Sequence, residues 1–184
     1  MTSTMLLGAA YGLSEVGLGL LKRSRDDSVD ADDSSLRVLW VTIMLAVTAG
    51  IFASSRVPGA AIAARAVFWV GCALFGLGLA LRWYSIVYLG RFFTVNVAIH
   101  SGHEVIDTGP YRWIRHPSYA GALLAFLGLA LCLANWWSLA LVMVPILWAF
   151  GRRMSVEESA LANALGAPYV QYMGRTKRLA PFIY

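Results

Sequence analysis

The chain has 184 residues, of which 59% are apolar and only 14% are charged, whereas soluble domains carry about 25% charged residues. The mean hydropathy is +0.64. This composition excludes a disordered, collagen-like or disulfide-stapled chain and disfavours a soluble globule. The net charge is +5, but the basic residues stand beside apolar runs, which indicates membrane topology rather than a nucleic-acid-binding face.

Apolar runs predict an all-α integral membrane protein with about five transmembrane helices, because a span needs about 17–25 mostly apolar residues. Three candidates precede residue 91, at residues 1–21, 38–55 and 60–81. The first contains Glu15, and the third is expected to continue as a helix towards residue 90. Residues 117–151 then contain no charged residue. This stretch is too long for one span and predicts a helical hairpin with its tip at Asn135.

Polar segments separate these spans. Residues 22–35 are rich in Asp, Ser and Arg and predict a solvated connection. The alternation from Thr94 to Ile99 predicts a short extended segment. Gly166 and Pro168 are expected to end the helix that follows the hairpin. We therefore divide the chain into residues 1–90, with three spans, and residues 91–184, with the polar motifs and the hairpin.

The distribution of Lys and Arg predicts the orientation in the membrane. With five spans and the N-terminus outside, only Arg56 and Arg65 of the 15 bases fall in outer segments. The inner bases are then Lys22, Arg23, Arg25, Arg37, Arg82, Arg91, Arg112, Arg115, Arg152, Arg153, Arg175, Lys177 and Arg178. The positive-inside rule favours this orientation, which puts the C-terminus and residues 82–118 and 151–184 on the cytoplasmic side.

Two polar clusters flank the predicted hairpin. The first contains His100, His103, Glu104, Asp107, Tyr111, Arg112, Arg115, His116, Ser118 and Tyr119. The second contains Arg152, Arg153, Glu157 and Glu158. Because a hairpin returns the chain to the side where it started, the two clusters are expected to lie close together. Ionisable groups at a membrane boundary are costly unless they are paired or used, which predicts a functional site there.

Several of these residues also have structural interpretations. Arg112 and Arg115 can keep their stems in apolar surroundings and their guanidinium groups at the membrane surface. Arg153 and Glu157 are one helical turn apart and can form a surface ion pair. The convergence of both clusters on one side, rather than any single residue, therefore carries the prediction of a site.

Two other kinds of site are disfavoured. His100 and His103 are spaced like metal ligands, but Gly102 argues against a helix there and no Cys or HExxH motif accompanies them. No metal site is therefore predicted. The chain also lacks a Walker-type loop and a GxGxxG motif after a strand, which argues against a soluble nucleotide-binding domain.

Two segments can be compared with a known signature. The first is His103-Glu104-Val105-Ile106 followed by Thr108-Gly109-Pro110-Tyr111-Arg112-Trp113-Ile114-Arg115-His116-Pro117-Ser118-Tyr119-Ala120-Gly121. The second comprises Arg153, Glu157-Glu158, Leu161, Leu165-Gly166, Tyr169, Tyr172 and Pro181. In order and spacing, residues 90–184 closely resemble the isoprenylcysteine carboxyl methyltransferase family and its phospholipid methyltransferase relatives.

The resemblance implies an integral membrane methyltransferase that uses S-adenosyl-L-methionine and releases S-adenosylhomocysteine. It implies that the cofactor is bound by His103, Glu104, Val105, Ile106, Tyr111, His116, Pro117, Ser118, Tyr119 and Glu157. It also implies that Arg153 faces the acceptor, so that Arg153 and Glu157 are the predicted catalytic residues. The chemistry agrees, since a carboxylate suits the ammonium or hydroxyl groups of the cofactor and tyrosine faces favour a nearby cation.

The predicted acceptor is a lipophilic small molecule with a carboxylate, phenol or amine, reached from the bilayer while the cofactor enters from the cytosol. A carboxylate needs no base and could be oriented by Arg153, whereas a phenol or amine needs a His or Glu as base. The chain is shorter than the eukaryotic enzymes, and the segment before residue 90 does not match, so prenylcysteine itself is not assigned. A membrane NADPH-dependent sterol or isoprenoid reductase and a non-enzymatic membrane module are the alternatives.

Overall fold

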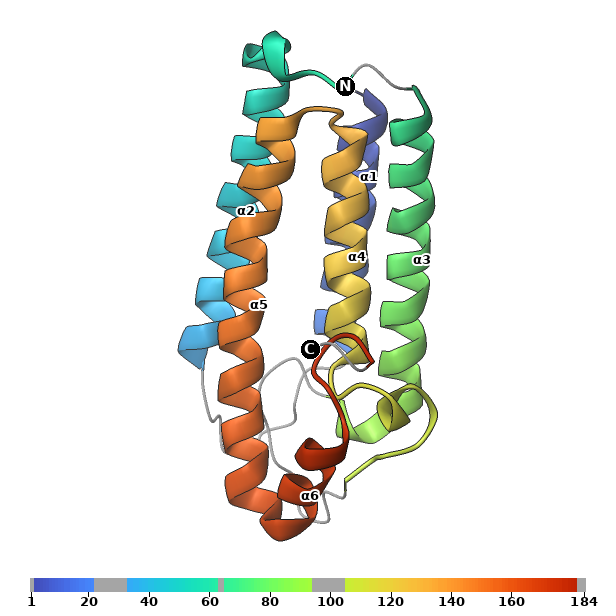
Figure 1. The fold of residues 1–184 in the computed structure, drawn as a ribbon, viewed down its shortest axis with the longest axis vertical. Coiled ribbons are helices and arrows are strands. Elements are labelled where there is room, and N and C mark those ends of the chain that lie inside the picture. Colours follow the sequence, from blue (N-terminus) through green and yellow to red (C-terminus); the bar gives the residue numbers. More distant parts are fainter. Residues whose placement is uncertain (1, 22–32, 63–64, 94–104, 182–184) are drawn as a thin grey trace.

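The computed structural model describes residues 2–21, 33–62, 65–93 and 105–181, which form a bundle of helices (Figure 1). Within these ranges the long helices are α1 (Thr2–Leu21), α2 (Asp33–Arg56), α3 (Arg65–Leu89), α4 (Pro117–Cys132) and α5 (Trp136–Leu165). The shorter ones are η1 (Pro58–Ala60), η2 (Gly90–Phe92), η3 (Gly109–Arg112) and α6 (Ala167–Arg175). Only isolated β-bridges occur among the described residues. The all-α prediction is confirmed.

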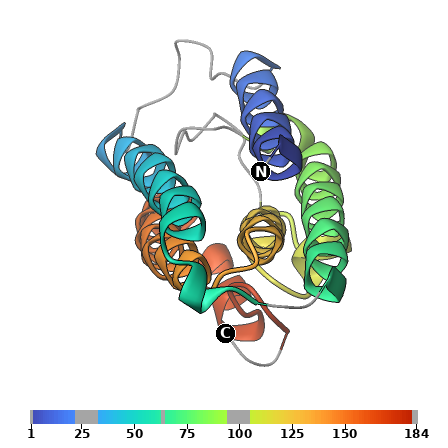
Figure 2. The same cartoon turned by 90° about the horizontal axis from the view of Figure 1, so that it is seen from above.

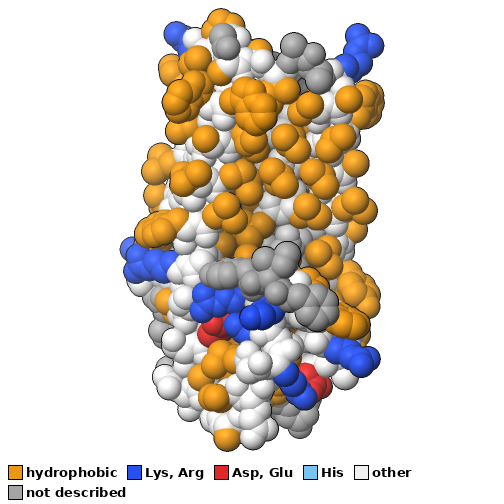
Figure 3. All heavy atoms as spheres, in the orientation of Figure 1, with side chains coloured by type: hydrophobic (Ala, Val, Ile, Leu, Met, Phe, Trp, Pro, Cys, Tyr) orange, Lys and Arg blue, Asp and Glu red, His pale blue; other side chains and the backbone are white. Residues whose placement is uncertain are grey.

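Three of the described helices, α2, α3 and α5, are long and apolar enough to cross a membrane. α4 is a shorter apolar helix of 16 residues. The integral membrane character is thus confirmed, whereas membrane crossing by α1 and α4, and with it the count of five spans, stays a prediction. Figure 3 shows apolar side chains over the upper part of one face, basic side chains at its upper corners, and a mixture of basic and acidic side chains below the apolar region.

The helices alternate in direction, so their polar stretches meet at one end of the bundle. The lower end in Figure 1, which we call the polar end, contains the start of α2, the end of α3, the start of α4, the end of α5, and α6. Arg56 ends α2 and Arg65 begins α3, so both lie at the end of the bundle opposite to the polar end. Residues 82–118 and 151–184 were predicted to lie on one side, and their described parts do lie at one end of the bundle. The cytoplasmic assignment of that end stays a prediction.

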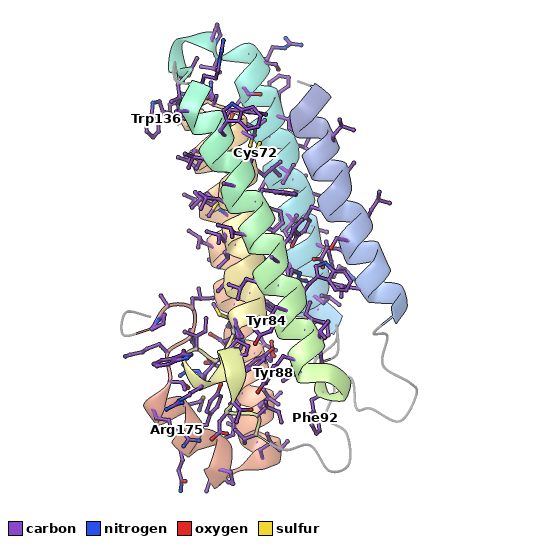
Figure 4. All side chains as sticks on the ribbon, turned by 90° about the vertical axis from the view of Figure 1, so that its right-hand side faces the viewer. Cys72, Tyr84, Tyr88, Phe92, Trp136 and Arg175 are labelled. Carbon is purple, nitrogen blue, oxygen red and sulfur yellow. The ribbon has the colours of Figure 1, made fainter. Side chains whose placement is uncertain are left out.

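Glycines let α3 and α4 pack in backbone contact (Figure 2). A Cβ atom on Gly71 would lie 2.7 Å from the carbonyl oxygen of Gly128, and one on Gly78 would lie 2.6 Å from that of Gly121. Such small-residue contacts are typical of close helix pairs in membranes. The same approach brings the sulfurs of Cys72 (Figure 4) and Cys132 to 3.7 Å as free thiols.

This contact yields a prediction for stability. Gly78→Ala is expected to lower the free energy of unfolding by about 1–3 kcal/mol, because the new methyl group would overlap the backbone of α4 around Ala125. Thermal unfolding in detergent measures the loss. Gly76→Ala is the matched control on the same helix, since a Cβ there meets no atom within 4 Å. Equal stability of the two variants would contradict this account of the packing.

The α4–α5 hairpin forms as its sequence predicts. Asn135 caps α5 by accepting a hydrogen bond from the Ser138 amide at 3.1 Å, and its amide donates to the carbonyl of Val57 at 2.9 Å. α5 contains Pro145 and ends at Leu165. Gly166, with φ of 63°, adopts a left-handed conformation that favours glycine and ends the helix.

Two segments differ from the expectation. A further helix, α6, follows Gly166, with Pro168 in its first turn, where proline is tolerated. α2 begins at Asp33, inside the segment predicted as a loop. The remainder of that loop and the predicted extended segment from Thr94 to Ile99 lie outside the described residues.

Candidate functional site

A cavity of about 230 Å³ opens at the polar end, between the helices and the segment that precedes α4. α1, α2, α3, α4, α5 and α6 all contribute to its lining. On the side of α1 and α2 the lining is largely apolar and includes Leu18, Leu36, Leu39, Trp40 and Ile43. Its polar lining comes mainly from the other side and includes Arg115, His116, Ser118, Arg153 and Glu157. Polar and apolar side chains therefore line one cavity, and we call the part lined by these polar residues the polar compartment.

The segment before α4 is held against the end of α3 by Tyr88 (Figure 4). Gly109 has a φ of 56°, and the Tyr88 ring occupies the place that a Cβ on Gly109 would take. The Tyr88 hydroxyl donates to Thr108 Oγ1 at 2.9 Å, and the Tyr111 hydroxyl donates to the Ser85 carbonyl at 3.2 Å. These contacts hold Tyr111 in the cavity wall.

The C-terminal segment is tied to the same region through Glu158. This buried carboxylate lies 2.9 Å from Arg115 Nε, 3.0 Å from His116 Nε2 and 2.7 Å from Arg178 Nη2. The amide of His116 donates to the Arg178 carbonyl at 3.0 Å. Arg115 also donates to the carbonyls of Met173 and Thr176. The interpretation of Arg115 as a residue that extends to the membrane surface is therefore wrong, because its donors are used to fix the C-terminal segment.

Glu157 and Arg153 lie one turn apart on α5 and both line the cavity. Glu157 accepts a hydrogen bond from the Tyr119 hydroxyl at 2.7 Å. The Tyr119 ring stacks on His116, with centroids 5.4 Å apart, and meets Phe150 edge-on at 5.3 Å. Arg153 is only 1% exposed and donates to Ser35 Oγ of α2 at 2.6 Å. The cavity lining thus contains a carboxylate and a guanidinium from the same helix.

The tyrosines of the polar end are neutral donors. Burial raises the pKa of Tyr172 to about 12 and raises the pKa of Tyr111 and Tyr169 further. The neutral Tyr172 hydroxyl donates to the Tyr111 carbonyl at 2.7 Å. At neutral pH these phenols can donate hydrogen bonds but do not accept a proton.

Most of the predicted site residues meet in this cavity. Its lining includes Val105, Ile106, Tyr111, His116, Ser118, Tyr119, Arg153 and Glu157. Pro117 is buried and starts α4 but is not part of the lining. His103 and Glu104 lie outside the described residues, as does His100. Among the residues that the structure describes, no group of three metal-binding side chains occurs.

The cavity lining also includes polar residues that were not predicted for the site, among them Tyr11 of α1. Glu15 and Arg82 line it from α1 and α3, and Tyr169 and Tyr172 line it from α6. Glu15 and Arg82 could have been recognised from the sequence, since each stands in or beside an apolar span where ionisable groups are costly. For Tyr169 and Tyr172, the only signal in the sequence was their match to the family signature.

The fold and this cavity define a helical integral membrane protein with a ligand-sized cavity at its polar end. The family model described as "Isoprenylcysteine carboxyl methyltransferase (ICMT) family" matches residues 69–163, more than half of the chain. The chain belongs to this family, which confirms the resemblance of its motifs.

Named relatives are consistent with this family, and a solved structure shares the fold. The chain is 32% identical over 136 residues to "Protein-S-isoprenylcysteine O-methyltransferase" of Saccharomyces cerevisiae, with 72% of this chain and 56% of that protein covered. It is 32% identical over 122 residues to "Protein-S-isoprenylcysteine O-methyltransferase B" of Arabidopsis thaliana, with 63% of this chain and 61% of that protein covered. The structure of a eukaryotic intramembrane Ras methyltransferase, ICMT, shares the fold with a TM-score of 0.74 at 24% identity, covering 98% of this chain and 66% of that one. The chain thus spans a little over half the length of the yeast relative.

Proposed function

We propose that this protein is an S-adenosyl-L-methionine-dependent membrane methyltransferase that esterifies the carboxylate of a lipophilic, isoprenoid-bearing acceptor. One observation carries the proposal: a single cavity joins the polar residues of the family signature to an apolar wall from α1 and α2. A polar cofactor and a lipophilic acceptor require this combination. We also propose that the polar end faces the cytoplasm, with the N-terminus outside, because most bases belong to segments at that end.

The residues of the polar compartment fit the cofactor. When bound, S-adenosyl-L-methionine supplies an electrophilic methyl group on a positively charged sulfonium. Glu157 presents a carboxylate that suits the ammonium or hydroxyl groups of this molecule, and the Tyr111 and Tyr119 rings offer faces for a cation. Val105, Ile106, His116 and Ser118 line the same compartment. We assign cofactor binding to these residues, together with His103, Glu104 and Pro117 of the signature.

The names of the relatives and the chemistry of the cavity lining favour one chemical class of acceptor. The yeast and Arabidopsis names specify O-methylation of an isoprenylcysteine, so we favour a carboxylate over the phenol and amine that the sequence left open. A carboxylate is already deprotonated at neutral pH and needs no base. Arg153 would orient this carboxylate through charge-assisted hydrogen bonds. The apolar wall would hold the isoprenoid chain.

The test begins with cofactor binding to detergent-purified protein. We expect micromolar binding of S-adenosylhomocysteine in a calorimetric titration and no binding of NADPH. Labelled S-adenosyl-L-methionine should then methylate N-acetyl-S-farnesylcysteine, whereas farnesylphenol and farnesylamine should stay unlabelled. Binding of NADPH alone, or methyl transfer only to the phenol or amine, would overturn the proposal in its cofactor or its acceptor respectively.

A further inference from the structure

A buried ion pair joins α1 to α3 in the cavity wall. Arg82 Nε lies 2.6 Å from Glu15 Oε1, and Arg82 Nη2 lies 2.7 Å from Glu15 Oε2. The two side chains are only 9% and 7% exposed. Both residues line the cavity, beside Tyr11 and Ser118. The geometry is bidentate, which is the strongest arrangement between a guanidinium and a carboxylate.

Stability alone explains this pair poorly. Removing two charges from water costs several kcal/mol per ion, and apolar residues of similar volume often stabilise a fold as well or better. Ionisable side chains within membrane-crossing helices are rare and usually serve a function. Glu15 stands in α1 beyond the region that the family model matches, so the family signature does not account for it.

The Arg82 guanidinium has N–H donors that Glu15 does not use. Glu15 takes Nε and Nη2, whereas Nη1 makes only one long contact among the described residues, to the Ser118 carbonyl at 3.4 Å. An arginine has five N–H donors. A buried cation with unused donors therefore lines the same cavity as Arg153.

We propose that Arg82 is a second cation for the acceptor's carboxylate and that Glu15 is its positioning residue. Glu15 fixes the guanidinium through Nε and Nη2, so that Nη1 is presented to an anionic group. The Glu15 charge also offsets that of Arg82 when no acceptor is bound, and it thereby limits how strongly the cavity attracts anions. The inference rests on the proposed function for its ligand class.

The charges of the cavity lining support this assignment. Glu157 is available to a cofactor that carries a net positive charge, while Glu15, Arg82 and Arg153 together carry one net positive charge toward the acceptor. A carboxylate acceptor neutralises that excess. An alcohol, a phenol or an ester has no charge to neutralise that excess and therefore gains no comparable attraction from it.

The test uses binding rather than turnover, on S-adenosylhomocysteine-loaded protein. The two probes are N-acetyl-S-farnesylcysteine and its uncharged methyl ester. Arg82→Gln should raise the Kd of the carboxylate about tenfold or more, because a charge-assisted hydrogen bond is lost. Glu15→Gln keeps the size of the side chain and one accepting oxygen for the guanidinium but removes the opposing charge, so it should lower that Kd about threefold or more. The Kd of the ester should change less than twofold in both variants.

A neighbouring contact supplies the matched control. Trp83 Nε1 donates to Ser14 Oγ at 2.7 Å and also ties α1 to α3, but neither residue lines the cavity. Ser14→Ala should therefore weaken the docking of α1 without changing the preference for the carboxylate. If Arg82→Gln does not fold, Arg82→Lys keeps the charge, loses the bidentate geometry, and should raise the carboxylate Kd by a smaller factor.

The outcomes separate this inference from the proposed function. Shifts of opposite sign, confined to the carboxylate, support it even if no methyl transfer is detected. If both variants bind the carboxylate and the ester more weakly to the same extent, the Glu15–Arg82 pair has only a structural role. This result overturns the inference and does not contradict the proposed methyl transfer. A wild-type protein that binds the two probes equally also overturns it.

Discussion

Glu157→Gln is expected to weaken the binding of S-adenosylhomocysteine by roughly 10- to 100-fold. The Glu157 carboxylate lines the polar compartment and is held there by the Tyr119 hydroxyl at 2.7 Å. Hydrogen bonds to a charged group are worth about 1.5–3 kcal/mol, and about 1.4 kcal/mol corresponds to a factor of ten. The amide keeps the shape of the side chain and loses its charge. Calorimetric titration of the detergent-purified variant measures the affinity directly.

Two further variants show whether the carboxylate itself carries the effect. Tyr119→Phe removes the hydroxyl that orients Glu157 and should produce a smaller loss, because the charge remains. Ser155→Ala lies on the same helix at an exposed position and should leave the affinity unchanged. Wild-type affinity in Glu157→Gln would contradict the assigned role, and so would a Tyr119→Phe variant that binds as weakly as Glu157→Gln.

The sequence predicted the features that depend on neighbours along the chain. The charge-free run 117–151 is too long for one span, so a hairpin with its tip at Asn135 followed from length alone. That hairpin brings the segment before α4 next to the end of α5, where Tyr119 meets Glu157. The convergence of the two polar clusters was therefore predictable without knowledge of any other helix contact.

The rest of the cavity depends on pairings between distant residues. Glu15 and Arg82 are 67 positions apart, and Ser35 and Arg153 are 118 positions apart. Neither spacing leaves a periodic pattern, because each pair is created by the packing of separate helices. Arg115 illustrates the same limit: its charge beside an apolar run fitted a residue at the membrane surface, whereas Glu158 and two carbonyls of the C-terminal segment bind it.

Arg153→Lys is expected to lower kcat by roughly 100-fold or more while changing the affinity for S-adenosylhomocysteine less than twofold. Arg153 lines the cavity, is 1% exposed and donates to Ser35 Oγ. Loss of one preorganised donor typically costs about 10²–10³ in kcat, and an ammonium cannot reproduce the planar geometry of a guanidinium beside a carboxylate. The lysine keeps the buried charge, so the variant tests orientation rather than charge balance. Single-turnover transfer from labelled S-adenosyl-L-methionine gives the rate.

The partner of Arg153 provides the decisive comparison. Ser35→Ala leaves the guanidinium in the cavity and removes its hydrogen bond to Ser35 Oγ of α2, so the rate should fall much less than in Arg153→Lys. If Arg153 were needed only to hold α2 against α5, the two variants would lose stability and rate together. Retained turnover with weakened cofactor binding in Arg153→Lys would instead assign the residue to cofactor binding. A large loss of kcat in Arg153→Lys, with cofactor affinity and thermal stability unchanged, is the result that puts its guanidinium at the acceptor.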